Sequence, residues 1–223
     1  NLNFEKDITN KEINEYRRLE NNLIDEIKEI KKQKDLLEKE KDVKIEVLSH
    51  KKDEREKLSN KAFYEIIKFK EGLDKELEGK IEKSLWEMGL LDSFISPDNS
   101  IFDKFLSPSE RKEENLTKYI EVEEDFENKD LVERILSSIG TEETGDIYIT
   151  NEGKYKNLLI YGKVDKWEGR YIGLEARKKL RLQKIDKLNK EIDKLEERLS
   201  FAKENILPFS LATSTLLLLF TFI

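Results

Sequence analysis

The chain has 223 residues, of which 41% are charged and 37% apolar, and its formal net charge is −7. So few apolar residues can fill a seam between helices and one small domain, but not a core for the whole chain. The mixed-sign charge excludes a globally basic nucleic-acid binder. The absence of cysteine excludes disulfides and thiolate metal sites, which fits a cytoplasmic protein.

Residues 1–79 are predicted to form an N-terminal coiled-coil arm, because residues 11–77 contain no proline and only one glycine, Gly72. Lysines such as Lys34 interrupt the heptad pattern, so a solvated single helix is the alternative interpretation. Because the chain begins at Asn1 inside this arm, we expect it to be a piece of a longer protein. The apolar seam positions are Tyr16, Leu23, Ile27, Ile30, Leu37, Leu48, Leu58, Ala62 and Phe69.

Residues 80–173 contain seven of the nine glycines and are predicted to form a small α+β, hinge-like globule. A helix is expected to end at Gly89. Residues 146–150 and 157–164 alternate in the manner of strands around a turn at 151–153, which predicts a β-hairpin. The aromatic residues of this region are interpreted as core.

Residues 174–205 are predicted to form a C-terminal coiled-coil arm. Their apolar residues recur in steps of three and four. Two such arms around one globule predict an antiparallel pair, with the 58–69 segment facing 185–195. The fold class is therefore mostly α, an antiparallel coiled coil capped by a hinge-like globule. The seam positions of the second arm are Ile185, Leu188, Ile192, Leu195, Leu199 and Ala202.

Residues 206–223 form an apolar tail without a single charged residue. The favoured interpretation is a truncated or frame-shifted reading frame. A tail anchor in a membrane and an unusual buried helix are the alternatives.

The sequence contains no phosphate-binding GxxxxGK[ST] motif and no recognisable catalytic set. Its one histidine, His50, is interpreted as a surface residue. We therefore assign no catalytic, cofactor-binding or metal-binding residue and expect this segment not to be an enzyme.

The strongest electrostatic signal is a basic stretch at residues 154–187, where eleven basic and four acidic residues leave 11 − 4 = +7. Such a stretch can neutralise DNA phosphates without reading sequence. A solvated helix face paired with acidic residues of the first arm is the alternative. The DNA-contact candidates are Lys154, Lys156, Lys163, Lys166, Arg170, Arg177, Lys178, Lys179, Arg181 and Lys184.

Two segments, LWEMGLLDSFISPD at 85–98 and WEGRYIGLEAR at 167–177, resemble a known family. They are similar to the middle region of the SMC-like ATPase subunit of Wadjet anti-plasmid systems (JetC type), a distant relative of MukB. The resemblance covers roughly residues 80–200. The Tyr171–Gly173 junction, which leads into a basic helix, is its more specific part.

The resemblance implies the hinge and coiled coil of a DNA-loop-extruding ATPase that acts in plasmid defence or chromosome maintenance. It implies a homodimer through the hinge, non-specific DNA binding, and kleisin-like and accessory subunits. ATP and Mg²⁺ would bind ATPase heads outside this chain. The alternative function is a tail-anchored coiled-coil tether on the cytoplasmic face of a membrane, which requires the apolar tail to be genuine.

Overall fold

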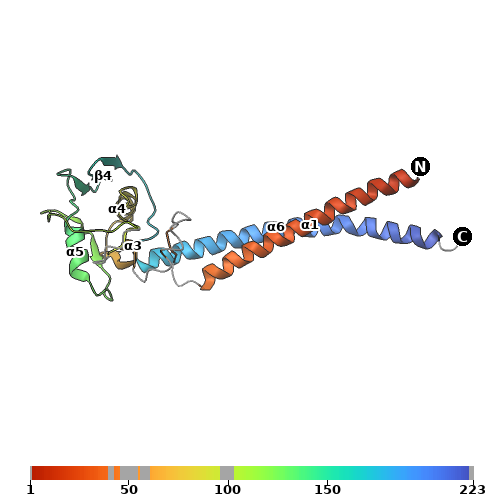
Figure 1. Cartoon of the computed structure of the whole chain (residues 1–223), viewed down its shortest axis with the longest axis horizontal. Coiled ribbons are helices and arrows are strands. Elements are labelled where there is room, and N and C mark those ends of the chain that lie inside the picture. Colours follow the sequence, from red (N-terminus) through yellow and green to blue (C-terminus); the bar gives the residue numbers. More distant parts are fainter. Residues whose placement is uncertain (1, 40–42, 46–54, 56–60, 96–102, 221–223) are drawn as a thin grey trace. The chain divides into compact units, whose positions relative to one another are not determined.

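The chain forms two compact units. The computed structural model describes residues 2–39, 43–45, 55, 61–95 and 103–220, with backbone only for residues 2–10 and 206–220. The first unit contains residues 1–41 and 181–223, and the second contains residues 42–180. Figure 1 shows long helices in the first unit and short helices and strands in the second. The fold is therefore mostly α, with two small sheets.

The first unit is built from α1 (Leu2–Lys39) and most of α6 (Leu174–Phe220), which run antiparallel (Figure 1). Apolar residues spaced three or four apart face each other between the helices, because that spacing lies on one side of an α-helix. At their edge, Lys31 Nζ lies 2.7 Å from Glu196 Oε1. The apolar cluster consists of Leu23, Ile27, Ile30, Leu188, Ile192, Leu195 and Leu199.

The apolar seam residues predicted at the middle of α1 are the ones that α6 covers. Leu23, Ile27 and Ile30 are all buried. Lys34, which interrupts the predicted seam, is half-buried and its Nζ lies 3.7 Å from Glu38 Oε1. A solvated single helix does not describe this part of α1, since a second helix packs on it.

The first long helix is shorter than the predicted arm of residues 1–79. It ends at Lys39, and the core of the second unit contains Val43 and Ile45. Residues 62–69 form α3 (Phe63–Ile66) and β1 (Ile67–Phe69), because six apolar residues among eight are too many for one helical stripe. The predicted pairing of 58–69 with 185–195 is wrong, since α6 packs against residues 23–30 instead. Leu48, His50 and Leu58 lie outside the described residues.

The last helix, α6, continues past the predicted end of the second arm at residue 205 and through most of the apolar tail, as far as Phe220. Residues 221–223 lie outside the described part of the chain. Over the residues that the structure describes, no helix is long and apolar enough to cross a membrane.

The core of the second unit lies between α3, α4 (Lys75–Glu87), α5 (Lys129–Ser137) and the sheet of β1 with β2 (Ile120–Val122). β1 and β2 are antiparallel, with Ile67 opposite Val122. Asp74 caps the start of α4, because its side chain accepts hydrogen bonds from the amides of Glu76 and Leu77. Gly89, with φ 71°, follows the end of α4 as predicted. A short 3₁₀ helix, η1 (Leu116–Lys118), precedes β2.

A three-stranded antiparallel sheet stands where the sequence predicts a two-stranded hairpin. Its strands are β3 (Ile147–Ile149), β4 (Lys154–Asn157) and β5 (Ile160–Lys163), in that order. The predicted second strand splits at a two-residue turn, Leu158–Leu159, in which Leu158 has φ 53°. A leucine at positive φ is uncommon, so turn chemistry does not reveal this turn in the sequence.

Candidate functional site

The ten predicted DNA-contact residues are divided between the two units. Eight lie in the second unit, on β4, β5, the connection to α6 and the first turns of α6. Arg181 and Lys184 lie in the first unit, half-buried on α6.

The lysines of the three-stranded sheet are neutralised by carboxylates. Lys154 Nζ lies 2.5 Å from Glu143 Oε1, and the hydrogen bond to Glu143 is the main reason that the pKa of Lys154 is raised. Lys156 pairs with Asp146 at 3.2 Å, and Lys163 pairs with Asp165 at 3.4 Å. Residues 143–166 contain four basic and four acidic residues, so their sum is zero. The +7 of the basic stretch does not describe this surface, because Glu143 and Asp146 precede that stretch.

Arg177 is buried and was wrongly assigned to the DNA-contact set. Its side chain is 2% exposed, and Nη1 donates hydrogen bonds to the carbonyl oxygens of Tyr64 (3.0 Å) and Tyr171 (2.8 Å). Buried arginine is retained where its donors are satisfied. One acceptor comes from Tyr64, 113 residues earlier, and sequence spacing cannot reveal such a partner.

Three exposed cations remain around the start of α6: Lys166, Arg170 and Lys178. Among the residues that the structure describes, none of the three forms an ion pair. The neighbouring Lys179 does, because its Nζ lies 2.7 Å from Glu168 Oε1. The Arg170 guanidinium lies 4.5 Å from the centre of the Trp167 ring, which favours an ordered position for this cation.

The segment that bears these cations is fixed to α4 by a buried carboxylate, Glu82. Glu82 accepts hydrogen bonds from three successive backbone amides, those of Arg170 (2.7 Å), Tyr171 (2.9 Å) and Ile172 (2.9 Å). Its fourth donor is Trp167 Nε1 at 3.3 Å. Glu82 is 0% exposed, so four donors replace its lost hydration without a basic side chain. Sequence reasoning missed Glu82, although its place between Ile81 and Leu85 on one helical face was an available signal.

A glycine lets α4 and this segment touch. A Cβ atom on Gly79 would lie 1.8 Å from the carbonyl oxygen of Trp167, so no other residue fits there without displacement. Aromatic rings fill the rest of the contact, with 5.2 Å between the ring centres of Trp86 and Tyr171. α4 and the 167–172 segment, which directly precedes α6, therefore form one packed junction, which we call the α4–α6 junction.

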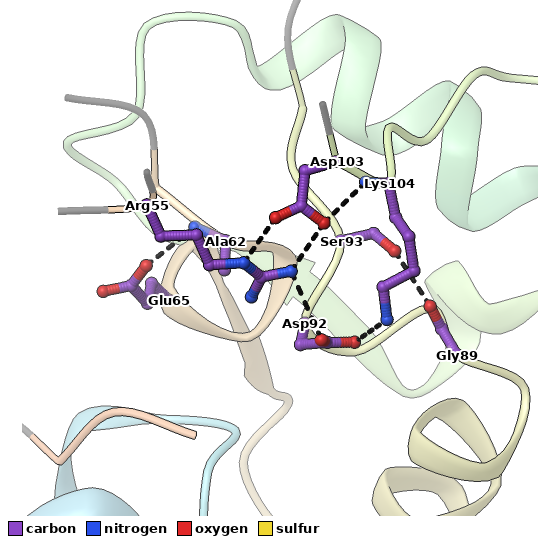
Figure 2. A network of polar contacts seen from close by, with 8 residues as sticks. All are labelled: Arg55, Ala62, Glu65, Gly89, Asp92, Ser93, Asp103 and Lys104. Atoms are coloured by element: carbon purple, nitrogen blue, oxygen red, sulfur yellow. Dashed lines mark hydrogen bonds and ion pairs between the residues drawn. The ribbon is translucent and has the colours of Figure 1, made fainter. Parts of the chain in front are cut away.

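A second polar network joins residue 55 to the segments after α4 (Figure 2). Arg55 forms two hydrogen bonds to Asp103, at 2.5 and 2.8 Å, and one to Asp92 at 3.4 Å. Lys104 also pairs with Asp92. Burial lowers the pKa of Arg55, but the hydrogen bonds and charges of Asp103 and Asp92 outweigh burial and leave that pKa raised.

The network of Figure 2 connects chain segments, because its charged side chains pair with one another. Two acidic and two basic side chains neutralise one another, and Ser93 donates its hydroxyl to the carbonyl oxygen of Gly89. Over the described residues, no group of three or more His, Cys, Asp or Glu side chains is placed to hold a metal ion.

No protein-family profile, no curated protein and no solved structure matches this chain.

Proposed function

We propose that this chain is a hinge-like globule with its paired helices from an SMC-like ATPase, and that it contacts DNA without sequence preference. In the proposal, the full-length protein extrudes DNA loops in plasmid defence or chromosome maintenance. Its ATP and Mg²⁺ sites lie outside this segment, which does not hydrolyse ATP. It forms a homodimer through the globule and works in the cytoplasm with kleisin-like and accessory subunits.

One observation carries this proposal: the chain passes along α1, forms a compact unit over residues 42–180 and passes back along α6. Residues 23–30 of α1 pack against residues 188–199 of α6, so the two helices form an antiparallel pair. An antiparallel pair that brackets one globule is the arrangement that the SMC-like resemblance implies. The resemblance at 167–177 falls on the α4–α6 junction, where Glu82 holds the backbone.

The α4–α6 junction also supports the DNA part of the proposal. Lys166, Arg170 and Lys178 are exposed within one stretch of thirteen residues, 166–178. Phosphate contacts need cations that are accessible and not neutralised by carboxylates. The lysines of β4 and β5 do not meet the second condition, since Glu143, Asp146 and Asp165 pair with them.

The test compares two triple variants that remove the same charge. The first is Lys166→Gln, Arg170→Gln, Lys178→Gln, and the matched control is Lys154→Gln, Lys156→Gln, Lys163→Gln. Binding to two unrelated duplex DNAs is followed by fluorescence anisotropy over a range of salt concentrations. If three phosphates are contacted, the slope of log K against log salt is about −2.7 at about −0.9 for each contact.

We expect the first variant to lose most of this slope and the control to keep it. Arg170→Gln leaves the backbone amide that binds Glu82 unchanged, so the junction stays intact. Equal losses in both variants, or tight binding to only one of the two DNAs, contradict the proposal.

A further inference from the structure

The turn between β4 and β5 exposes four consecutive apolar side chains. Leu158 is 61% exposed, Leu159 94%, Ile160 50% and Tyr161 81%. A run of this length on a surface costs solubility unless it is used for binding. Leu158 also holds a positive φ, which is strained for leucine and brings no burial within the chain. Both observations indicate that this turn meets a partner.

The charges around the turn favour a protein partner. The lysines of β4 and β5 are paired with carboxylates, and residues 143–166 have a formal charge of zero. A neutral rim of mixed signs gives no excess attraction for DNA or an anionic membrane. An apolar centre with a polar rim is the composition of a protein–protein interface.

β5 is also an edge strand. In the part of the chain that the structure describes, only β4 pairs with it. The Thr150 amide donates to the carbonyl oxygen of Lys154, and the Val164 amide donates to that of Gly153. Because hydrogen-bonded residues alternate along antiparallel strands, the backbone amide and carbonyl groups of Ile160 and Gly162 point toward β4. The amide and carbonyl groups of Tyr161 and Lys163 therefore face away from the sheet, and a further strand can pair with them.

We propose that β5 pairs antiparallel with β5 of a second copy of this chain, around a two-fold axis at Tyr161. In this register the two Tyr161 residues exchange backbone hydrogen bonds and their rings are cross-strand neighbours. Ile160 stands opposite Gly162, and Leu159 stands opposite Lys163, so the two copies of Lys163 do not face each other. The same patch serves on both copies, as in other two-fold dimers.

The contact is small, because β5 has only four residues, so the dimer is weak and depends on concentration. This contact rests on the proposed function, because β5 would be the surface through which the proposed homodimer forms. Its test uses no DNA binding by the α4–α6 junction, so each proposal can fail without the other.

Cysteine crosslinking tests the register in the full chain, which has no cysteine of its own. In the proposed register the two Cα atoms at position 161 lie about 5.5 Å apart, within the range of a disulfide. Position 163 lies on the same face of β5, but its two copies are displaced along the strands by about 13 Å. We expect Tyr161→Cys to form a disulfide-linked dimer under mild oxidation. We expect Lys163→Cys to form no disulfide-linked dimer. Equal crosslinking of both variants overturns the proposal.

Sedimentation equilibrium of the unmodified chain provides the second measurement. We expect reversible dimerisation, weakened roughly tenfold by Leu159→Ser, because the change removes apolar contact twice in the interface without placing a charge opposite Lys163. Leu159 is so exposed that this change leaves folding intact. A monomer at every concentration, or an unchanged dimer in Leu159→Ser, overturns the proposal. Loss of binding to phosphatidylserine vesicles in Leu159→Ser does so too, because it assigns the turn to a membrane surface.

Discussion

Two carboxylates in the second unit are removed from water by different means. Glu82 is bound by three backbone amides and an indole, whereas the Asp103 side chain, 5% exposed, is bound by the guanidinium of Arg55 and the amide of Lys104. Backbone donors hold Glu82 only while the 170–172 segment keeps its conformation. A side-chain donor such as Arg55 can follow its partner when the backbone moves. The contact of Glu82 at the α4–α6 junction is therefore rigid, whereas the contact between Arg55 and Asp103 is adaptable.

The largest effect is expected for Glu82→Gln. The amide of glutamine turns an NH₂ group toward two of the four donors, so buried N–H groups lose their acceptor. We expect a loss of about 2–6 kcal/mol in the free energy of unfolding, at about 1–3 kcal/mol for each of the two unsatisfied donors. Urea denaturation followed by tryptophan fluorescence measures it, because both tryptophans, Trp86 and Trp167, lie at this junction.

The control for this variant is Glu87→Gln, also on α4. Glu87 pairs with Lys83 at 2.7 Å, but its side chain is 42% exposed, and exposed ion pairs contribute about 0–1 kcal/mol. Similar losses in Glu82→Gln and Glu87→Gln would show that the four donors contribute no special stability.

A smaller loss is expected for Arg55→Gln. Asp103 keeps one donor, the amide of Lys104 at 2.7 Å, and water can approach because the Arg55 side chain is itself 12% exposed. We expect about 1–3 kcal/mol, the usual cost of leaving a mostly buried charged group with fewer partners. Lys104→Gln is the control, since that side chain is 43% exposed. A loss larger than that of Glu82→Gln would reverse the comparison.

The periodic parts of the fold can be predicted from the sequence, whereas the contacts between distant segments cannot. Leu23, Ile27 and Ile30 recur in steps of four and three, so their packing against another helix follows from spacing alone. The end of α1 at Lys39 cannot be predicted in this way, because no glycine or proline marks it. The apolar run at 62–69 is likewise compatible with either a helix or a strand.

The basic stretch at 154–187 shows the same limit for the candidate site. Counting charges along the chain gives +7, but the neutralising residues Glu143 and Asp146 reach the lysines through the sheet. Arg177 looks like its exposed neighbours in sequence, but it is buried where the carbonyl oxygens of Tyr64 and Tyr171 accept its hydrogen bonds. Lys166, Arg170 and Lys178 remain accessible, which sequence alone does not distinguish.

The smallest effect is expected at Glu168, a carboxylate that is exposed, whereas Glu82 is buried and Asp103 is mostly buried. The hydrogen bond from Lys179 at 2.7 Å, and then its charge, hold the pKa of Glu168 below its ordinary value. A lowered pKa in the folded state means that this pair stabilises the fold above the unfolded-state pKa. The contribution disappears as the pH falls through the folded-state pKa.

Carboxyl NMR titration of the chain checks this effect. We expect Lys179→Gln to raise the pKa of Glu168 toward its ordinary value, and added salt to do the same in the unmodified chain. Lys178→Gln is the control, because that neighbour is exposed and does not pair with Glu168. A pKa that stays low in Lys179→Gln would mean that another group, such as Arg170, holds the carboxylate. In contrast to Glu82, Glu168 is bound by an exposed lysine side chain at the surface, so loss of that pair leaves the α4–α6 junction folded.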